Sequence, residues 1–76
     1  MKDILSILAD MGIEIDLLEP DSVLGDNLGM DSQEIVELHC NIEDFFGIDL
    51  PMNSINKNHS LKDLNQLVQQ SVGVAV

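Results

Sequence analysis

The segment 32–46 constrains the fold of this chain most, because its apolar residues recur at the spacing of an amphipathic helix. Advancing about 100° per residue from Ser32 brings one set of apolar side chains into a single arc that would face a core. That set is Ile35, Leu38, Ile42, Phe45 and Phe46. The opposite, exposed face would carry Gln33, Glu37, Cys40 and Asp44, and Val36 and Glu43 would lie between this face and the edge that carries Ser32.

Both ends of this helix are marked by residues that favour helix termini. Asp31 or Ser32 can act as the N-cap, and Glu34 stands three residues after Asp31, as a capping box requires. Gly47 follows the last apolar residue and is suited to end the helix. The sequence therefore predicts a helix that begins beside Ser32 and ends at Phe46.

Two further segments also have helical patterns. Residues 1–11 place Ile4, Leu8 and Met11 on one stripe, and the glycine that follows can stop the helix. Ser60 can cap a last helix, because Asp63 stands three residues later. We expect residues 71–76, at the end of that helix, to fray.

The segments between the helices are read as loops. Residues 13–31 lose helical periodicity and contain Pro20, Gly25 and Gly29, which predicts a long loop. Its apolar side chains should pack onto the core; they are Ile15, Leu17, Leu18, Val23, Leu24 and Leu28. An extended link ending at Pro51 should precede one short helical turn within residues 52–58. The predicted fold is all-α, a small antiparallel four-helix bundle with three main helices, one short helix and a long first loop, forming one domain over residues 1–76.

Composition excludes several classes of partner. Three Lys, no Arg and fourteen acidic residues give a net charge of −11, and the only aromatic residues are two Phe. Nucleic-acid binders need a basic footprint, and proteins that bind single strands stack bases on aromatic rings. The same charge disfavours an anionic membrane surface, and no apolar run approaches the ~20 residues of a membrane span. We expect a cytoplasmic, monomeric protein with basic protein partners.

The chain offers little for catalysis or for metal binding. Its single cysteine, Cys40, excludes an internal disulfide and a CxxC motif. Cys40 and His39 are neighbours on a predicted helix and point about 100° apart, so they do not form a nucleophile–base pair. The acidic region 26–31 lacks the ligand spacing of a calcium loop. We therefore predict no catalytic residue and no metal site.

Residues 28–32 read Leu-Gly-Met-Asp-Ser, and this segment resembles the attachment motif of the acyl carrier proteins. The resemblance extends over the whole chain through Glu37-Leu38, Ile42-Glu43, Phe46-Gly47-Ile48, Leu50-Pro51 and Ser60-Leu61. It implies that Ser32, beside the motif residue Asp31, carries a covalent 4′-phosphopantetheine group. A phosphopantetheinyl transferase would attach this group from coenzyme A with Mg²⁺. Acyl groups would then be held as thioesters on its terminal thiol.

The resemblance also implies two sets of binding residues. The first would contact basic docking patches on the transferase and on acyl-transferring and condensing enzymes; it comprises Met30, Gln33, Glu34, Val36, Glu37, Cys40, Glu43 and Asp44. The second would line an acyl pocket between the helices and comprises Val36, Ile42, Leu50 and Ile55. The chain departs from the family pattern at Gln33, where Leu is usual, at Phe45, where an acid is frequent, and at Asn58, where an apolar residue is usual. These departures suggest a carrier for a specialised lipid or secondary-metabolite pathway.

Three alternatives stay open at this point. The first is an aminoacyl or peptidyl carrier, although the strong acidity favours the acyl type. The second is a small helical interaction module without a prosthetic group, in which Ser32 only caps a helix. The third is a minimal enzyme that uses Cys40 or Ser32. Mass gain in the presence of coenzyme A and a transferase would separate the second and third alternatives from both kinds of carrier.

Overall fold

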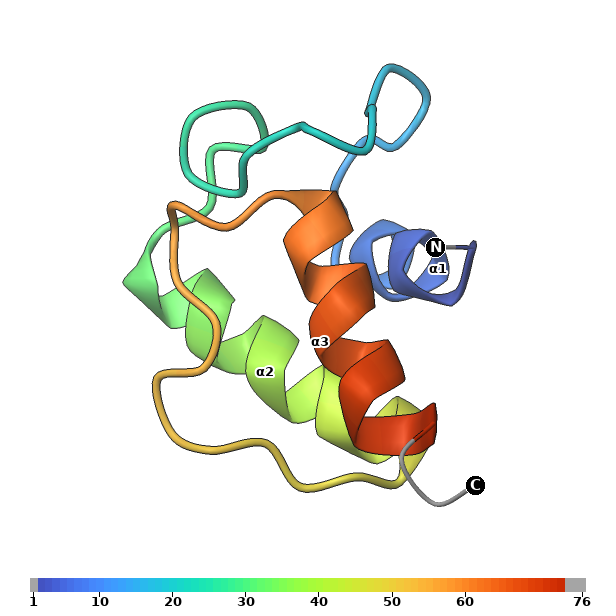
Figure 1. Ribbon diagram of the computed structural model, residues 1–76. Helices are drawn as coiled ribbons and strands as arrows, with labels where there is room; N and C mark the ends of the chain where they lie inside the picture. Colours follow the sequence, from blue (N-terminus) through green and yellow to red (C-terminus); the bar gives the residue numbers. More distant parts are fainter. Residues whose placement is uncertain (1, 74–76) are drawn as a thin grey trace.

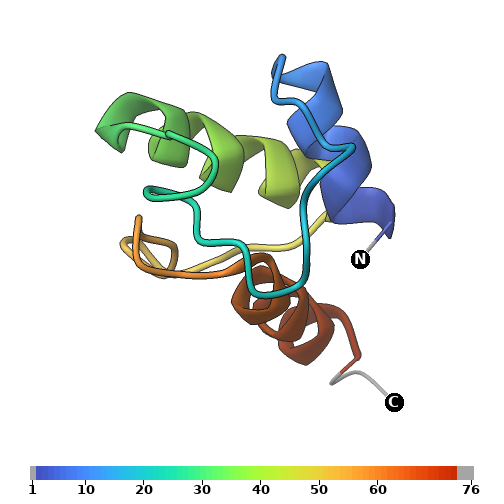
Figure 2. The same ribbon diagram turned by 90° about the horizontal axis from the view of Figure 1, so that it is seen from above.

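The computed structural model describes the backbone of residues 2–73 and the side chains of residues 3–71. Within these residues it contains the helices α1 (Lys2–Asp10), α2 (Ser32–Phe46) and α3 (Leu61–Gly73), and no strand (Figure 1). Helix α1 packs against both α2 and α3, and the loop from residue 47 to residue 60 runs beside α2 (Figures 1 and 2). None of the described helices has both the length and the apolar character needed to cross a membrane.

Capping bonds explain where two of the helices begin. Asp31 is the N-cap of α2: its Oδ1 accepts from the Glu34 backbone N–H at 2.9 Å, and Glu34 Oε1 accepts from the Asp31 N–H at 3.2 Å. Ser60 and Asp63 exchange the same pair of bonds before α3. The hydrogen bond from the Ser60 backbone N–H lowers the pKa of the Asp63 carboxylate below its ordinary value. Both predicted capping boxes are confirmed.

The first two helices end shortly before the glycines predicted to stop them. Gly47 has φ 65° and ψ 40°, the left-handed conformation that a side chain would strain, and its N–H donates to the Glu43 carbonyl. Gly12, after α1, has φ 87°. Helix α3 includes residues 71–73, which we expected to fray, whereas residues 74–76 lie outside the described part of the chain. The predicted start of the first helix at Met1 also lies outside it.

The core is aliphatic, which agrees with a sequence that has no Trp and no Tyr. Its buried members are Ile4, Ile7, Leu8, Leu24, Met30, Ile35, Leu38, Ile42, Leu50, Ile55, Leu61, Leu64 and Val68. Two apolar predictions are wrong. Phe45 is 54% exposed, and its ring forms a T-shaped pair with that of Phe46, with the ring centroids 5.0 Å apart. Leu17 is 92% exposed, whereas Leu24, Ile15, Leu18 and Leu28 of the same loop do pack inward.

The predicted short fourth helix does not form. Asn53 has φ 65°, which interrupts any helical turn in residues 52–58. Side chains then take the place of helical carbonyls, because the Asn56 N–H donates to His59 Nδ1 at 3.0 Å and the Asn58 N–H donates to Asn56 Oδ1 at 2.9 Å. The fold is therefore all-α with three helices in the described part of the chain, and residues 48–60 form an irregular loop.

The two long loops are joined to each other by backbone hydrogen bonds. The Leu24 N–H donates to the His59 carbonyl and the Gly25 N–H donates to the Lys57 carbonyl, both at 2.9 Å. A β-bridge pairs Val23 with Ser60 on the same line of contact. We call this contact the loop seam. It fixes the ends of both loops beside the N-terminus of α2, because the Met30 N–H also donates to the Leu24 carbonyl at 3.1 Å.

Candidate functional site

Ser32 is the first residue of α2 and is exposed. Asp31 supplies the cap, so the Ser32 hydroxyl is not needed to hold the helix end. The first-turn N–H groups of a helix have no intrahelical acceptor, and the helix dipole is positive at this end. Ser32 is therefore an accessible hydroxyl in a place that favours an anion attached to it.

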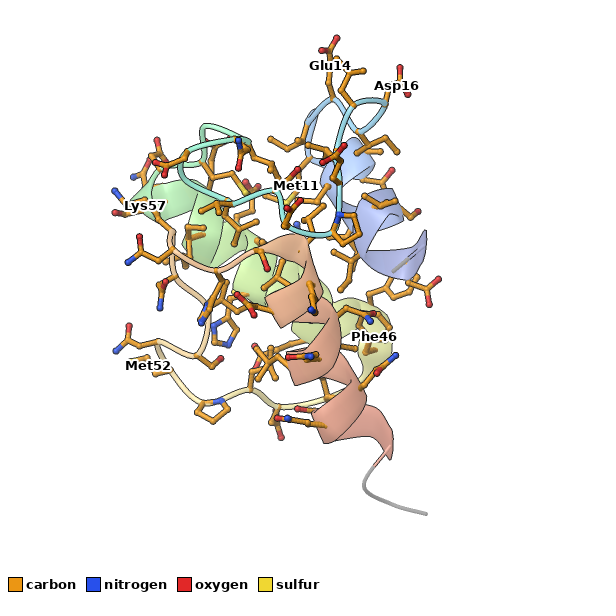
Figure 3. All side chains as sticks on the ribbon, turned by 45° about the horizontal axis from the view of Figure 1, so that its top comes forward. Met11, Glu14, Asp16, Phe46, Met52 and Lys57 are labelled. Atoms are coloured by element: carbon orange, nitrogen blue, oxygen red, sulfur yellow. The ribbon has the colours of Figure 1, made fainter. Side chains whose placement is uncertain are left out.

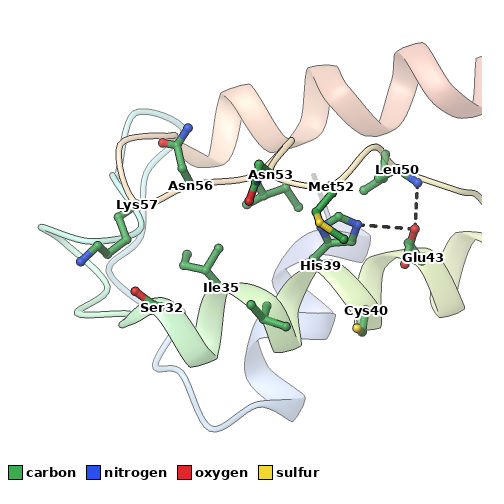
Figure 4. Close-up of a pocket in the computed structure, with 12 residues that line it drawn as sticks. Ser32, Ile35, His39, Cys40, Glu43, Leu50, Met52, Asn53, Asn56 and Lys57 are labelled. Atoms are coloured by element: carbon green, nitrogen blue, oxygen red, sulfur yellow. Dashed lines mark hydrogen bonds and ion pairs between the residues drawn. The ribbon is translucent and has the colours of Figure 1, made fainter.

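An open groove of about 680 Å³ begins at Ser32 and extends along α2 (Figure 4). Ile35 and Val36 line it from the helix, and Leu50 and Ile55 line it from the loop of residues 48–60. Its volume is in the range of small-molecule sites, and a mostly apolar lining suits an aliphatic ligand. Three of the four predicted acyl-pocket residues, Val36, Leu50 and Ile55, therefore line one groove together with Ser32.

The fourth predicted pocket residue, Ile42, does not line the groove. Its side chain is 0% exposed and belongs to the core cluster. The helical period gives the reason, since Ile42 lies at the centre of the core-facing arc, whereas Ser32, Val36, His39 and Glu43 follow one strip beside it. The structure therefore places Ile42 in the core rather than on the wall of this groove.

The far end of the groove holds a polar cluster. Glu43 Oε2 accepts from the Leu50 backbone N–H at 2.8 Å and lies 3.5 Å from His39 Nε2 (Figure 4). The carboxylate thereby links α2 to the loop that forms the opposite wall of the groove. Glu43 was predicted on a docking face and His39 was given no role, although a His four residues before a Glu is a helical pair that periodicity can detect.

The predicted docking residues divide into three groups. Gln33, Val36, Glu37, Cys40 and Asp44 are exposed along α2, as expected. Glu34 and Glu43 are half-buried and use their carboxylates in hydrogen bonds to the backbone. Met30 is only 2% exposed and packs in the core, so its assignment to the docking surface is wrong. Its backbone turns inward because its N–H bonds to the Leu24 carbonyl.

The groove also contains residues that the sequence did not mark, and Met52 and Lys57 are two of them. Met52 is 88% exposed at the groove edge, and Lys57 lines the same end of the groove as Ser32 (Figures 3 and 4). Neither lies on a helix, so no periodic pattern marks them. Cys40 and His39 also line the groove, but no hydrogen bond joins them in the described structure. Residues 3–71 bring together no cluster of three or more metal-ligating side chains.

The acidic surface should make stability depend on salt. Among the side chains of residues 3–71 the one close contact between a basic and an acidic group joins His39 and Glu43, and Lys62 and His59 act on Asp63 from a longer range. Most of the described carboxylates therefore lack a close basic partner. Some, such as Glu14 and Asp16, point away from the body of the protein (Figure 3). We expect the melting temperature to rise with added NaCl or millimolar Mg²⁺, because both screen this repulsion. Thermal unfolding followed by circular dichroism measures the effect, and equal melting temperatures across both titrations would contradict it.

The site fits a phosphopantetheine group. Its phosphate would lie at the N-terminus of α2, and the apolar groove beside Ser32 offers space for the rest of the arm and a cargo. The side chains around Ser32 would bind and orient such a group. The group itself would supply a thiol on which acyl chains form thioesters.

Comparison with known proteins agrees with this geometry. The family model for the phosphopantetheine attachment site matches residues 2–68. An acyl carrier protein of Zymomonas mobilis subsp. mobilis is 33% identical over 57 residues, which are 75% of this chain and 73% of that protein. The chain therefore belongs to the acyl carrier protein family, whose attachment domain carries a covalent 4′-phosphopantetheine group.

Proposed function

We propose that this chain holds acyl intermediates as thioesters on a 4′-phosphopantetheine group attached to Ser32. It would present them to enzymes of fatty-acid, polyketide or related biosynthesis. One observation carries the proposal: Ser32 is exposed at the N-terminus of α2 and opens into the apolar groove along that helix. The whole chain, residues 1–76, would act as one attachment domain, located in the cytoplasm.

The attachment needs chemistry that the chain does not provide. The Ser32 oxygen would attack the phosphorus that carries pantetheine in coenzyme A. An oxygen–phosphorus bond would form while the pyrophosphate bond breaks, and 3′,5′-ADP would leave. The hydroxyl proton needs a base, and the neighbouring Asp31 carboxylate is engaged as the helix cap. We assign this base to the transferase, in keeping with a carrier that catalyses no step itself.

The direct test is an intact-mass measurement. The purified chain is incubated with coenzyme A, Mg²⁺ and a broad-specificity phosphopantetheinyl transferase. We expect a gain equal to one 4′-phosphopantetheine group, and fragmentation of the modified peptide should locate it on Ser32. A chain that gains no mass would favour the alternative of an interaction module without a prosthetic group.

The exposed face of α2 is proposed to dock the partner enzymes. Glu37 and Asp44 are exposed on this helix, and Val36 is a 63% exposed apolar side chain one turn from Ser32. A partner that reaches the group on Ser32 must approach this surface. Complementary charge raises association rates, and a desolvated apolar contact slows dissociation.

We expect Glu37→Lys to slow association with a basic acyl-transferring enzyme and to weaken the salt dependence of that rate. Val36→Ala should mainly speed dissociation. Surface plasmon resonance at low and high salt measures both rates, and circular dichroism checks that both variants stay helical. If Glu37→Lys associates at the wild-type rate at low salt, α2 is not the docking surface.

The departures from the family pattern support a specialised partner set. Gln33 and Phe45 are exposed, so both alter a surface that partners can contact rather than the core. Asn58 is also exposed and does not line the groove. These residues favour a dedicated lipid or secondary-metabolite pathway, and loading assays with matched acyl donors would identify its cargo.

A further inference from the structure

Lys57 is the cationic side chain that lines the groove together with Ser32. The close-up shows both residues at the same end of the groove, on opposite walls (Figure 4). The chain has three Lys and fourteen acidic residues, yet Lys57 forms no ion pair with any described carboxylate. An ammonium without a described carboxylate partner therefore lies at the same end of the groove as the hydroxyl that is proposed to carry a phosphate.

The backbone of Lys57 is held in place. Its carbonyl accepts from the Gly25 N–H at 2.9 Å in the loop seam. The two residues are so close that a Cβ on Gly25 would lie 3.0 Å from Lys57 Cβ and 3.1 Å from Lys57 O. The base of the lysine side chain is thus fixed across from the N-terminus of α2, while the flexible stem can adjust to an anion.

The electrostatic surroundings call for a cation at this position. Asp31 at the N-cap and Glu34 in the first turn of α2 carry carboxylates, and a phosphodiester on Ser32 would add a further negative charge beside them. Like charges at this separation disfavour one another. The helix dipole offsets part of that repulsion, and a nearby ammonium would offset more.

We propose that Lys57 is the positioning residue for the phosphate on Ser32. Its ammonium pairs with the phosphodiester and holds the start of the arm at the mouth of the groove, so that the arm runs along α2. This inference rests on the proposed attachment at Ser32. It assigns to the loop of residues 48–60 a direct contact with the prosthetic group.

The test measures whether the effect of the modification on stability depends on Lys57. The wild-type chain, Lys57→Gln, Lys57→Arg and the control Lys62→Gln are each prepared unmodified and fully modified, as verified by mass. Lys62 is exposed on α3 and does not line the groove. Urea unfolding then gives the folded-to-unfolded ratio of every form at low salt and at about 1 M NaCl, where the Debye length is about 3 Å.

We expect modification to change the folded-to-unfolded ratio of Lys57→Gln less favourably than that of the wild type, by a factor of about two to five. This is the size expected for loss of an exposed ion pair. Lys57→Arg and Lys62→Gln should respond to modification as the wild type does. The difference should vanish at high salt, and the ¹⁵Nζ signal of Lys57 should shift on modification of the wild type.

Several results would overturn the inference. Equal responses of the wild type and Lys57→Gln, or an unmoved ¹⁵Nζ signal, would show that no pair forms. A folded Lys57→Gln that accepts no group would assign Lys57 to transferase recognition instead. Absence of mass gain in the wild type would overturn the proposed function itself. This outcome is distinct from failure of the Lys57 inference, because the effect of Lys57 on stability is measured only after modification has been verified.

Discussion

Ser32→Ala is expected to abolish the mass gain in the transferase reaction while leaving the fold intact. The substitution removes the proposed attacking oxygen, and no neighbouring hydroxyl replaces it in the segment 28–34. Because Asp31 rather than Ser32 caps α2, the free energy of unfolding should change by less than about 0.5 kcal/mol. Intact mass and urea unfolding measure the two effects.

Ser6→Ala is the matched control, since Ser6 is an exposed serine within α1. It should gain the full mass of one group, as the wild type does. Full modification of Ser32→Ala would mean that the group is attached elsewhere.

Leu38→Ala is expected to destabilise the protein by about 2–5 kcal/mol, because it removes a side chain that is 0% exposed and leaves a cavity. A domain of this size has a thin core, so this loss is a large part of its stability. Val36→Ala, two residues earlier on the same helix, is the control, because Val36 is 63% exposed. It should cost less than about 0.5 kcal/mol.

Urea unfolding of the two variants beside the wild type makes the comparison. A large difference would confirm that α2 buries the Leu38 side and leaves the Val36 side exposed to solvent. Similar midpoints for both variants would contradict the orientation of α2 on which the groove and the docking surface depend.

Local signals predicted the helices well, because capping and periodicity are properties of short segments. The pairs Asp31–Glu34 and Ser60–Asp63 mark the starts of α2 and α3 in the sequence as in the structure. Phe45 was misassigned because it lies at the edge of the core-facing arc, where a small rotation decides burial. The short fourth helix was misassigned because the left-handed Asn53 and the side-chain bonds of Asn56 and His59 compete with helical bonds.

The site was predictable only in part, for a similar reason. Ser32 and its motif are contiguous, so they are visible in the sequence. The groove joins α2 to a loop that is distant along the chain, so the places of Lys57, Met52 and the His39–Glu43 pair depend on tertiary contacts. The burial of Met30 follows from its backbone bond to Leu24, which residue type alone does not indicate.

The loop seam also bears on the order in which the chain acquires its structure. It pairs residues from the first third of the chain, such as Val23 and Leu24, with Ser60 and His59 near its end. Contacts between residues far apart in the sequence require a long loop to close, which costs chain entropy before the contact contributes any stabilisation. We therefore expect the seam to close after the helices have formed. Leu24 in turn holds Met30, two residues before Ser32. Attachment of the group to Ser32 would then occur only on fully folded chains. A transferase that recognises this geometry would leave incompletely folded chains unmodified.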